Sequence, residues 1–523
     1  MNKMFFSSKI IFSIILIIIS FYINYYYANL GVYPIDTFAF FDTAYNILIG
    51  RHPFKDIWIT TGPVVDYMQA FFFKIFGLNW KSYVIHGSLI NSLITFYFFK
   101  TLVDLNFSKF LSFIYALCFS ILCYTISGTP FAYIHSYVFS LLSILIFVNG
   151  ISLKSNKCFF FLPLTMSMAF LSMQNPSTFI NFIILIFLTI FFLKKENLKY
   201  LYSFFKGGIF ILFLLILFFV ITNIPLENFL QQYILFPLSI GESRVIGNEM
   251  AHLTLSDRFT FRNVIGHFKF INILLIIFTY ISLRDLLKKK INFNNKIINF
   301  LLIFSGVFFI FNQLITSNQT YIFSLIPFLG AFIHLYIYKS IRTNKLQWLI
   351  LIIMIFSTVK YHQEYNQKRK FMDLQQVNLR NTIDAQLIDI KFKGLNWITP
   401  VFPNNPKLEI QFLKEAIADV KKENRKKIVL TTYQFFSFIT EENLNIPNRW
   451  YTHDNNSYPL DNNKYYNIYK KHLEKVFYGN EVEVAYTVGP IKFSNFKIYI
   501  KDICFDETRI NKLTTKYILK SCK

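Results

Sequence analysis

Long apolar runs separated by short polar connections are the feature that most restricts the fold of this chain. The composition agrees, because 54% of the 523 residues are hydrophobic and 20% are aromatic. A membrane span needs roughly 17–25 predominantly apolar residues. By this criterion there are about eleven candidate spans, at 8–28, 82–102, 108–126, 133–153, 157–173, 176–194, 200–222, 266–284, 295–315, 319–339 and 346–362. The sequence therefore predicts an α-helical polytopic membrane protein.

The positions of the basic residues predict which connections face the cytoplasm. With the N-terminus inside, the cytoplasmic connections hold Lys100, Lys109, Lys154, Lys157, Lys194, Lys195, Lys199, Lys206, Arg284, Lys288, Lys289, Lys290, Lys296, Lys339, Arg342 and Lys345. The opposite connections at 127–132, 174–175 and 316–318 contain no Lys or Arg. An odd number of spans places the C-terminus outside, in the periplasm if the membrane is a bacterial inner membrane. Because the charge of +24 is dispersed in this way, we expect no nucleic-acid partner.

Three segments on the predicted outer side are long enough to have structure of their own. They are a first outer loop at 29–81, a second at 223–265, and a polar tail at 363–523 that follows the transmembrane region 1–362. The tail has the composition of a soluble protein and the size of an ordinary domain. We predict a separate periplasmic domain.

Local patterns in the tail predict an α/β fold. Residues 408–420 have the apolar spacing of a helix, and 428–430 form a short apolar run typical of a buried strand. Residues 482–486 and 496–500 alternate as strands do. No Gly-rich phosphate loop or nucleophile elbow occurs in the tail, so we expect it to cover or recognise a substrate.

The five cysteines show no CxxC pair and no Cys/His spacing of a structural metal site. Three of them lie in or beside apolar runs. Cys504 and Cys522 lie in polar sequence and would be able to form a disulfide if the C-terminus is outside the cytoplasm.

The first outer loop carries several acids between two membrane segments. Residues 36–49 predict a helix with Asp36 as N-cap, and Gly50 follows where helices commonly end. A polar turn at 51–63 leads to a second amphipathic run at 64–76. Because both runs are rich in aromatic residues, we expect two helices lying in the membrane interface.

An acid just after the first span, a following aromatic helix, the Pro53-Phe54-Lys55-Asp56 turn, and Pro63 before the next helix form a recognisable combination. It resembles the first periplasmic loop of C-type glycosyltransferases, within which the nearest likeness is to the protein O-mannosyltransferase and aminoarabinose-transferase group. The likeness covers residues 1–360 in topology and about 30–67 in motifs.

The resemblance implies an inverting enzyme that moves a sugar from a polyprenyl-phosphate donor to a glycan, lipid or protein acceptor, with a loop carboxylate as general base. It implies no cofactor and leaves a divalent cation open. Asp36 matches the first acid of the group's Asp-Glu pair, but Thr37 stands at the second. Asp42 and Asp56 are then possible substitutes. Thr61-Gly62-Pro63 stands where the group has Lys-Pro-Pro, so that lysine is absent too.

Sugar transfer requires a base for the acceptor hydroxyl and cationic donors for the phosphate that leaves. Asp36 and Asp42 are the candidate bases. The candidate substrate-binding residues are Asp56, Arg51, Lys55, His52, His135, Arg244, Arg258, Gln174 and Asn175. Each also has a structural interpretation: helix capping or support for the acids, snorkelling for Arg51 and Lys55, a local pair with Glu242 for Arg244, and end-capping for His135, Gln174 and Asn175.

Other functions remain open at this point. An O-antigen ligase or polymerase also uses lipid-linked glycans, but would place its largest outer loop in mid-chain. A transporter or flippase of lipid-linked glycans would have ionisable residues in mid-membrane and broken spans in matching positions. A scaffold protein gives no reason for acids and bases to collect in two outer loops.

Overall fold

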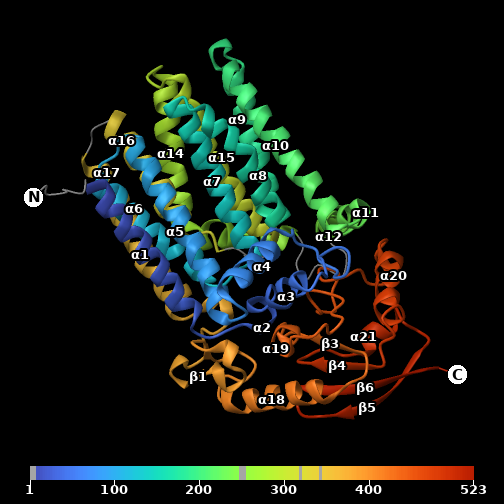
Figure 1. The fold of residues 1–523 in the computed structure, drawn as a ribbon. Coiled ribbons are helices and arrows are strands. Elements are labelled where there is room, and N and C mark those ends of the chain that lie inside the picture. Colours follow the sequence, from blue (N-terminus) through green and yellow to red (C-terminus); the bar gives the residue numbers. More distant parts are fainter. Residues whose placement is uncertain (1–7, 247–254, 317–320, 341–343, 523) are drawn as a thin grey trace, which may run out of the picture.

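The computed structural model describes residues 8–246, 255–316, 321–340 and 344–522, without the side chains of 242–246, 255–256 and 340. Eleven long helices in the described part overlap the predicted spans: α1 (Ser8–Ala28), α5 (Trp80–Asp104), α6 (Lys109–Leu122), α7 (Ala132–Leu153), α8 (Asn156–Ser172), α9 (Gln174–Phe192), α10 (Leu198–Thr222), α14 (Lys269–Leu287), α15 (Phe293–Thr316), α16 (Leu325–Ser340) and α17 (Asn344–Tyr361). They form one bundle, and the tail lies at one end of it (Figure 1).

Seven helical segments of the described chain are long and apolar enough to cross a membrane: Ser8–Ala28, Lys109–Ile126, Ala132–Leu153, Gln174–Phe192, Lys195–Thr222, Lys269–Leu287 and Phe293–Thr316. Among these, Ser8–Ala28 is α1 and Ala132–Leu153 is α7. The chain is therefore a helical membrane protein, as predicted. The count of about eleven spans and the orientation stay predictions.

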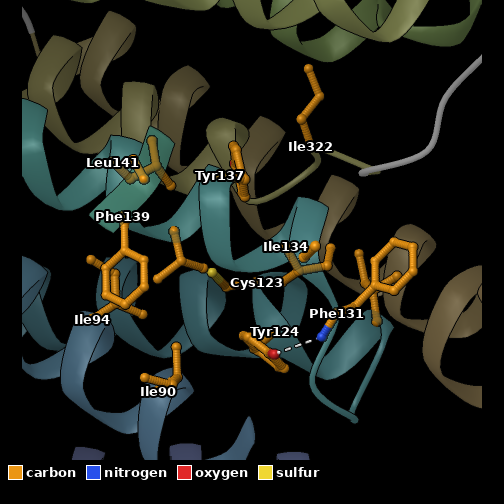
Figure 2. Close-up of a cluster of buried hydrophobic side chains, with 14 of the residues drawn as sticks. Ile90, Ile94, Cys123, Tyr124, Phe131, Ile134, Tyr137, Phe139, Leu141 and Ile322 are labelled. Atoms are coloured by element: carbon orange, nitrogen blue, oxygen red, sulfur yellow. Dashed lines mark hydrogen bonds between the residues drawn. The ribbon is translucent and has the colours of Figure 1, made fainter. Parts of the chain in front are cut away.

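The centre of the bundle is packed with aromatic and aliphatic side chains (Figure 2). Tyr124 and Tyr137 are fully buried, and the Tyr124 hydroxyl accepts a hydrogen bond of 3.2 Å from the amide of Phe131. Polar groups pair across helices in the same region, as where Asn24 Nδ2 donates to the carbonyl of Gly128 at 2.9 Å. Such pairing satisfies groups that lipid cannot.

The first outer loop contains three helices: α2 (Pro34–Thr37), α3 (Phe41–Leu48) and α4 (Val64–Phe76). The single helix predicted at 36–49 is interrupted between α2 and α3. Tyr33, and not Asp36, is the N-cap of α2, and Pro34 occupies the first turn. Proline suits that place because its missing N–H would have no partner there. The prediction for Gly50 is confirmed: it follows the C-cap of α3 with φ +84°.

Aromatic residues in the first part of this loop are buried by protein. Phe38 and Phe41 are fully buried. The ring of Phe38 stacks on Trp397 and meets Phe435 edge-on, and Phe41 meets Phe438 edge-on. Those three partners belong to the tail, which covers the loop. The aromatic face of the first part of the loop therefore packs against the tail, whereas α4 keeps an exposed apolar face. The position of α3 relative to the membrane interface stays a prediction.

The second outer loop is mostly helical where the structure describes it. Its short elements are α11 (Leu226–Phe229), the π-helical turn η3 (Leu230–Leu235), α12 (Phe236–Ile246), α13 (Leu255–Arg258) and the π-helical turn η4 (Arg262–His267). Gln232 Nε2 donates to the carbonyl of Phe54 at 3.0 Å, so this loop packs against the first.

The tail holds a four-stranded sheet and its helices. The larger elements are α18 (Pro406–Lys422), β3 (Lys427–Thr431), α19 (Phe436–Thr440), α20 (Tyr466–Phe477), β4 (Val484–Val488), α21 (Ser494–Lys497), β5 (Ile503–Arg509) and β6 (Thr514–Ser521). The strand order is β3-β4-β6-β5; β3 and β4 are parallel, and the other pairs are antiparallel. Smaller elements precede them: η5 (His362–Gln367), η6 (Lys370–Met372), η7 (Leu379–Asn381), β1 (Ile383–Asp384), η8 (Ala385–Leu387), η9 (Ile390–Phe392) and β2 (Asn396–Trp397).

The α/β prediction is confirmed for α18, β3 and β4, but the strand predicted at 496–500 is wrong. Residues 494–497 form α21. Phe496, Tyr499 and Ile500 are fully buried, and Ile498 is 37% exposed. Phe496, Tyr499 and Ile500 are spaced i, i+3 and i+4, so they lie on one face of a helical turn. The alternation of apolar residues in the sequence therefore did not indicate a strand.

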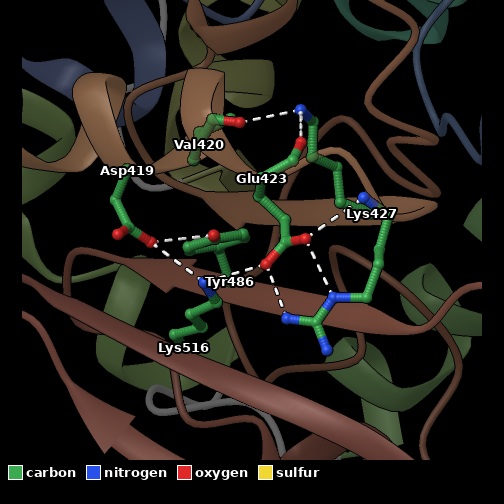
Figure 3. A network of polar contacts seen from close by, with 7 residues as sticks. Asp419, Val420, Glu423, Lys427, Tyr486 and Lys516 are labelled. Atoms are coloured by element: carbon green, nitrogen blue, oxygen red, sulfur yellow. Dashed lines mark hydrogen bonds and ion pairs between the residues drawn. The ribbon is translucent and has the colours of Figure 1, made fainter.

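Hydrogen bonds and an ion pair attach α18 to the sheet (Figure 3). The hydroxyl of Tyr486 donates to Asp419 at 2.8 Å, and Lys516 Nζ lies 2.9 Å from a Glu423 carboxylate oxygen. Lys427 Nζ donates to the carbonyl of Val420 at 2.7 Å. At the far edge Cys504 and Cys522 are joined in a disulfide, which links β5 to the end of β6.

Candidate functional site

A cavity of about 430 Å³ lies where the first outer loop, the second outer loop, the helix ends and the tail meet. It is lined by Tyr33, Ile35, Asp36, Thr60, Thr61, Phe131, Tyr133, Met173, Gln174, Asn175, Pro237, Ile240, Gly241, Thr316, Tyr321, Phe371, Asp373, Trp450, Thr452, Asp454, Asn456 and Ser457. No single segment forms it. The tail therefore contributes directly to the site.

Asp36 places its carboxyl group in the wall of this cavity. The short helix α2 starts at Pro34, and the amide of Asp36 donates to the carbonyl of Tyr33, which sets its position. Among the described residues the carboxylate accepts no hydrogen bond and has no cation within ion-pair distance. Burial, followed by the charge of Asp373, raises the pKa of Asp36 to about 7. A carboxyl group of this pKa exchanges protons near neutral pH.

Asp373 is a functional candidate that the sequence did not indicate. It ends η6 with φ +54°, a left-handed conformation that aspartate tolerates better than most residues. Burial raises the pKa of Asp373. Two carboxyl groups from segments more than 330 residues apart thus face one cavity. Thr37 of the first loop stands at the position where the resemblance implies a second acid. The tail supplies a second carboxyl group, that of Asp373, instead.

Aromatic rings and neutral polar groups make up much of the remaining wall. Trp450 is held by its indole N–H, which donates to the carbonyl of Ile35 at 3.2 Å. A third carboxylate, that of Asp454, accepts the amides of Asn456 and Ser457 in a local turn. The wall is therefore polar and apolar in about equal measure, with three carboxylates among its polar groups.

Gln174 and Asn175, predicted as substrate-binding, do line the cavity. Gln174 Nε2 donates to the carbonyls of Thr60 at 2.9 Å and Tyr233 at 2.6 Å, so it connects α9 with both outer loops. Its buried Oε1 has no partner among the described residues. Asn175 has extended backbone angles inside α9, with φ −112° and ψ 134°.

Asp42 and Arg51 do not line the cavity; both connect the first loop to the tail. Asp42 is buried, and its Oδ1 accepts the amide of Phe438 at 2.9 Å. Arg51 Nη1 donates to Asn443 Oδ1 at 2.9 Å, and Nη2 donates to the carbonyl of Ile446 at 3.2 Å. The structure gives both residues positions in an internal interface.

The other predicted residues of the first loop also lie outside the cavity wall. Asp56 Oδ2 accepts the amide of His52 at 2.9 Å, and the ring of His52 bonds to the hydroxyl of Tyr67 at 2.9 Å. Lys55 is half-buried and does not line the cavity.

His135 is buried in the bundle. Its two ring nitrogens contact the hydroxyl of Tyr124 at 2.8 Å and Nε2 of His86 at 3.1 Å. Its hydrogen-bonding groups are therefore used within the helices, and it does not line the cavity.

Lysine and arginine are absent from the described wall of the cavity. Arg258 is buried, and its Nη1 donates to the carbonyl of Ile315, the neighbour of the lining residue Thr316. Arg244 lies in α12, but its side chain is outside the described residues. These two remain the candidate cations of the second loop.

A buried ion pair lies behind the wall on the side of the tail. Arg449 forms it with Asp66 of α4, and both side chains have no exposed surface. Arg449 also donates to Thr61 Oγ1, and its guanidinium lies 4.5 Å from the ring centre of Phe40. Burial raises the pKa of Asp66 and lowers that of Arg449, and each charge opposes the shift of the other. Arg449 directly precedes Trp450 in the chain and contacts Thr61. The pair therefore connects two parts of the cavity wall, Thr61 of the first loop and Trp450 of the tail.

An apolar groove of about 580 Å³ lies beside the cavity, between α4, α8 and α10. Pro63 lines the groove and Thr61 lines the cavity, so only Gly62 separates the two sites along the loop. A Cβ atom at Gly62 would lie 1.8 Å from the carbonyl oxygen of Leu171. Glycine is required for this close approach of the loop to α8.

Within the described ranges, no group of three or more His, Cys, Asp or Glu residues is arranged to hold a metal ion. Comparison with family models gives no match, and no curated protein is significantly similar to the chain.

Proposed function

We propose that the protein is a membrane glycosyltransferase of the C-type, which moves a sugar from a polyprenyl-phosphate donor to a periplasmic or lipid-linked acceptor. One observation carries the proposal: Asp36, with a pKa of about 7, faces a cavity that is one residue away from a large apolar groove. A base near neutral pKa beside a lipid-sized groove suits a reaction between a lipid-borne donor and a hydroxyl group.

Asp36 is the proposed general base. As the acceptor oxygen forms its bond to the anomeric carbon, Asp36 takes the hydroxyl proton, and the bond from that carbon to the phosphate oxygen breaks. The electron pair leaves with the phosphate, and the anomeric centre inverts. Asp373 acts through Asp36. The negative charge of Asp373 disfavours ionisation of Asp36 and raises its pKa, so the ionised Asp36 carboxylate is a stronger base near neutral pH.

The donor would bind with its isoprenoid chain in the groove and its sugar in the cavity. The groove is lined almost wholly by apolar side chains, including Met68, Leu171 and Phe218. The phosphate that leaves needs cationic donors. Arg258 and Arg244 are the proposed sources, because the second loop reaches the cavity through Pro237, Ile240 and Gly241.

We place the site and the tail on the periplasmic side of a bacterial inner membrane. The outer loops and the tail gather at one end of the bundle (Figure 1). The Cys504–Cys522 disulfide supports this side, since disulfides persist in oxidising compartments.

The test is transfer of labelled sugars from a panel of polyprenyl-phosphate donors by membranes that contain the protein. Transfer from at least one donor, absent from control membranes, supports the proposal. Movement of a lipid-linked glycan between leaflets without sugar transfer would instead indicate a flippase. Transfer of a glycan from a diphosphate carrier to another glycan would indicate a ligase or polymerase.

The pH dependence of transfer should report the pKa of Asp36. Only the ionised carboxylate accepts a proton, so kcat/KM should rise as pH increases through about 7 and level off above it. Asp373→Asn removes the opposing charge and should move this rise to lower pH. A profile that is the same in both proteins would contradict the proposed coupling.

Gly62→Ala should lower both transfer and stability. The new methyl group would overlap the backbone of Leu171, so the loop must shift away from α8, at a cost of about 1–3 kcal/mol. Thermal unfolding in detergent and kcat/KM would measure the two effects. Gly208→Ala in α10 is the matched control, because a Cβ atom there meets nothing within 4 Å.

A further inference from the structure

A second polar cavity, of about 490 Å³, is lined by basic residues at the same end of the bundle. It lies between the start of α14 and the end of α17, and its wall comprises Gly266, His267, Lys269, Lys360, Tyr361, Gln363, Glu364, Tyr365, Gln367, Lys368 and Lys370. Four lysines face one carboxylate, so the wall has an excess of positive charge. None of these residues lines the cavity that contains Asp36.

Glu364 neutralises only part of this charge. It lies 3.0 Å from Lys368 Nζ and 3.6 Å from Lys370 Nζ. Lys269 and Lys360 have no carboxylate within ion-pair distance among the described residues. Lys269 also begins α14, whose N-terminus adds the positive end of a helix dipole.

The backbone around this cavity is unusual. Gly266 and His267 belong to the π-helical turn η4, and Gln363 to Gln367 belong to the π-helical turn η5. Turns of this kind are rare and occur frequently at functional sites. His267 lines the cavity, and its Nε2 atom is buried and has no hydrogen-bond partner among the described residues.

The location of the lysines also requires an explanation. The ends of α14 and α17 that carry them lie at the end of the bundle that holds the tail (Figure 1). In the predicted orientation this is the outer side, where lysines close to spans are depleted. Four lysines around one cavity on that side are therefore not explained by topology.

An aromatic wall separates this cavity from the one that contains Asp36. The ring of Tyr365, which lines the basic cavity, lies 4.8 Å from the ring of Tyr321, which lines the other. Lys370 Nζ lies 5.5 Å from the centre of the Tyr365 ring. The two cavities are neighbours with different linings, one acidic and one basic.

We propose that the basic cavity binds the phosphate group of an anionic ligand through Lys269, Lys360 and Lys370, at a site distinct from the sugar-transfer cavity. A lysine ammonium is a compact charge that binds phosphate well. Both α14 and α17 are predicted spans, so the cavity lies at the membrane boundary. A phospholipid headgroup can reach such a site from the outer leaflet, and inorganic phosphate can reach it from water.

The test measures binding to the full-length protein in two arms. One uses phosphatidylcholine vesicles with and without phosphatidylglycerol, and the other uses inorganic phosphate with the protein in neutral detergent. Lys269→Gln/Lys360→Gln is the test variant. Each lysine near a membrane surface contributes about 1 kcal/mol, so removal of two should weaken binding about 30-fold.

Two control variants should leave binding unchanged, and a third variant should strengthen it. Lys269→Arg/Lys360→Arg keeps both charges and should bind like the wild type. Lys421→Gln/Lys422→Gln removes the same charge from an exposed stretch of α18 and should also leave binding unchanged. Glu364→Gln removes the competing carboxylate and should tighten binding several-fold.

The pattern of the two arms identifies the source of the phosphate. Retention of phosphatidylglycerol alone assigns the site to a lipid headgroup, and equal binding of inorganic phosphate assigns it to a soluble anion. Both results support the site if the Lys269→Gln/Lys360→Gln variant loses the binding. Binding in neither arm, or equal binding by the wild type and the double glutamine variant, overturns the proposal.

Discussion

Asp36→Asn should lower kcat/KM for sugar transfer by about 10²–10⁴-fold, which is the range that a general base contributes. The amide has nearly the shape of the carboxylate but cannot accept the acceptor's proton. Binding of the donor's isoprenoid chain should change little, because the groove does not include this residue. The measurement is initial transfer rate at saturating and subsaturating acceptor.

Asp56→Asn is the matched control for this experiment. Asp56 belongs to the same loop but accepts the amide of His52 and does not line the cavity. Asparagine can accept the same hydrogen bond, so activity should remain close to that of the wild type. Full transfer by Asp36→Asn would remove its assignment as base, and equal losses in both variants would indicate a general effect on the loop.

Arg449→Met should destabilise the protein by about 3–5 kcal/mol, since it leaves the carboxylate of Asp66 buried without its partner. Because the pair joins α4 to the tail, the variant should also lose the fixed positions of Thr61 and Trp450 in the cavity wall. Chemical unfolding in detergent, followed separately by tail and bundle probes, would measure the loss.

A double variant separates the effect of a broken pair from the effect of lost packing. Arg449→Met/Asp66→Leu replaces both charges by apolar groups and should recover much of the stability, as buried pairs often allow. The pair between Lys470 and Glu474 is the exposed control, with side chains 36% and 39% exposed. Lys470→Gln should cost less than about 1 kcal/mol. Equal losses in Arg449→Met and the double variant would contradict the argument.

The helical bundle could be predicted from local sequence. An apolar run long enough to cross a membrane has few alternatives to a helix, because lipid offers no partner to backbone groups. Each predicted run overlaps a helix for this reason. The same holds for α18, where apolar spacing and an Asn405 N-cap act within one segment.

The first outer loop shows where local patterns were insufficient. Its phenylalanines suggested a helix in the membrane interface, since an aromatic face seeks any apolar surroundings. The tail competes with lipid for that face: Phe38 packs against Trp397 and Phe435, and Phe41 packs against Phe438. Nothing near Phe38 in the sequence indicates which surroundings it will have.

The sequence by itself determined that this is a helical membrane protein with an acid placed just after its first long helix. Only the tertiary structure decided which groups join Asp36 in one cavity. Asp373 and Trp450 come from the tail, and Gln174 from the end of a bundle helix. The physical reason is that periodicity and capping act over a few residues, whereas burial and the charge of Asp373, which raise the pKa of Asp36, depend on segments brought together only by folding.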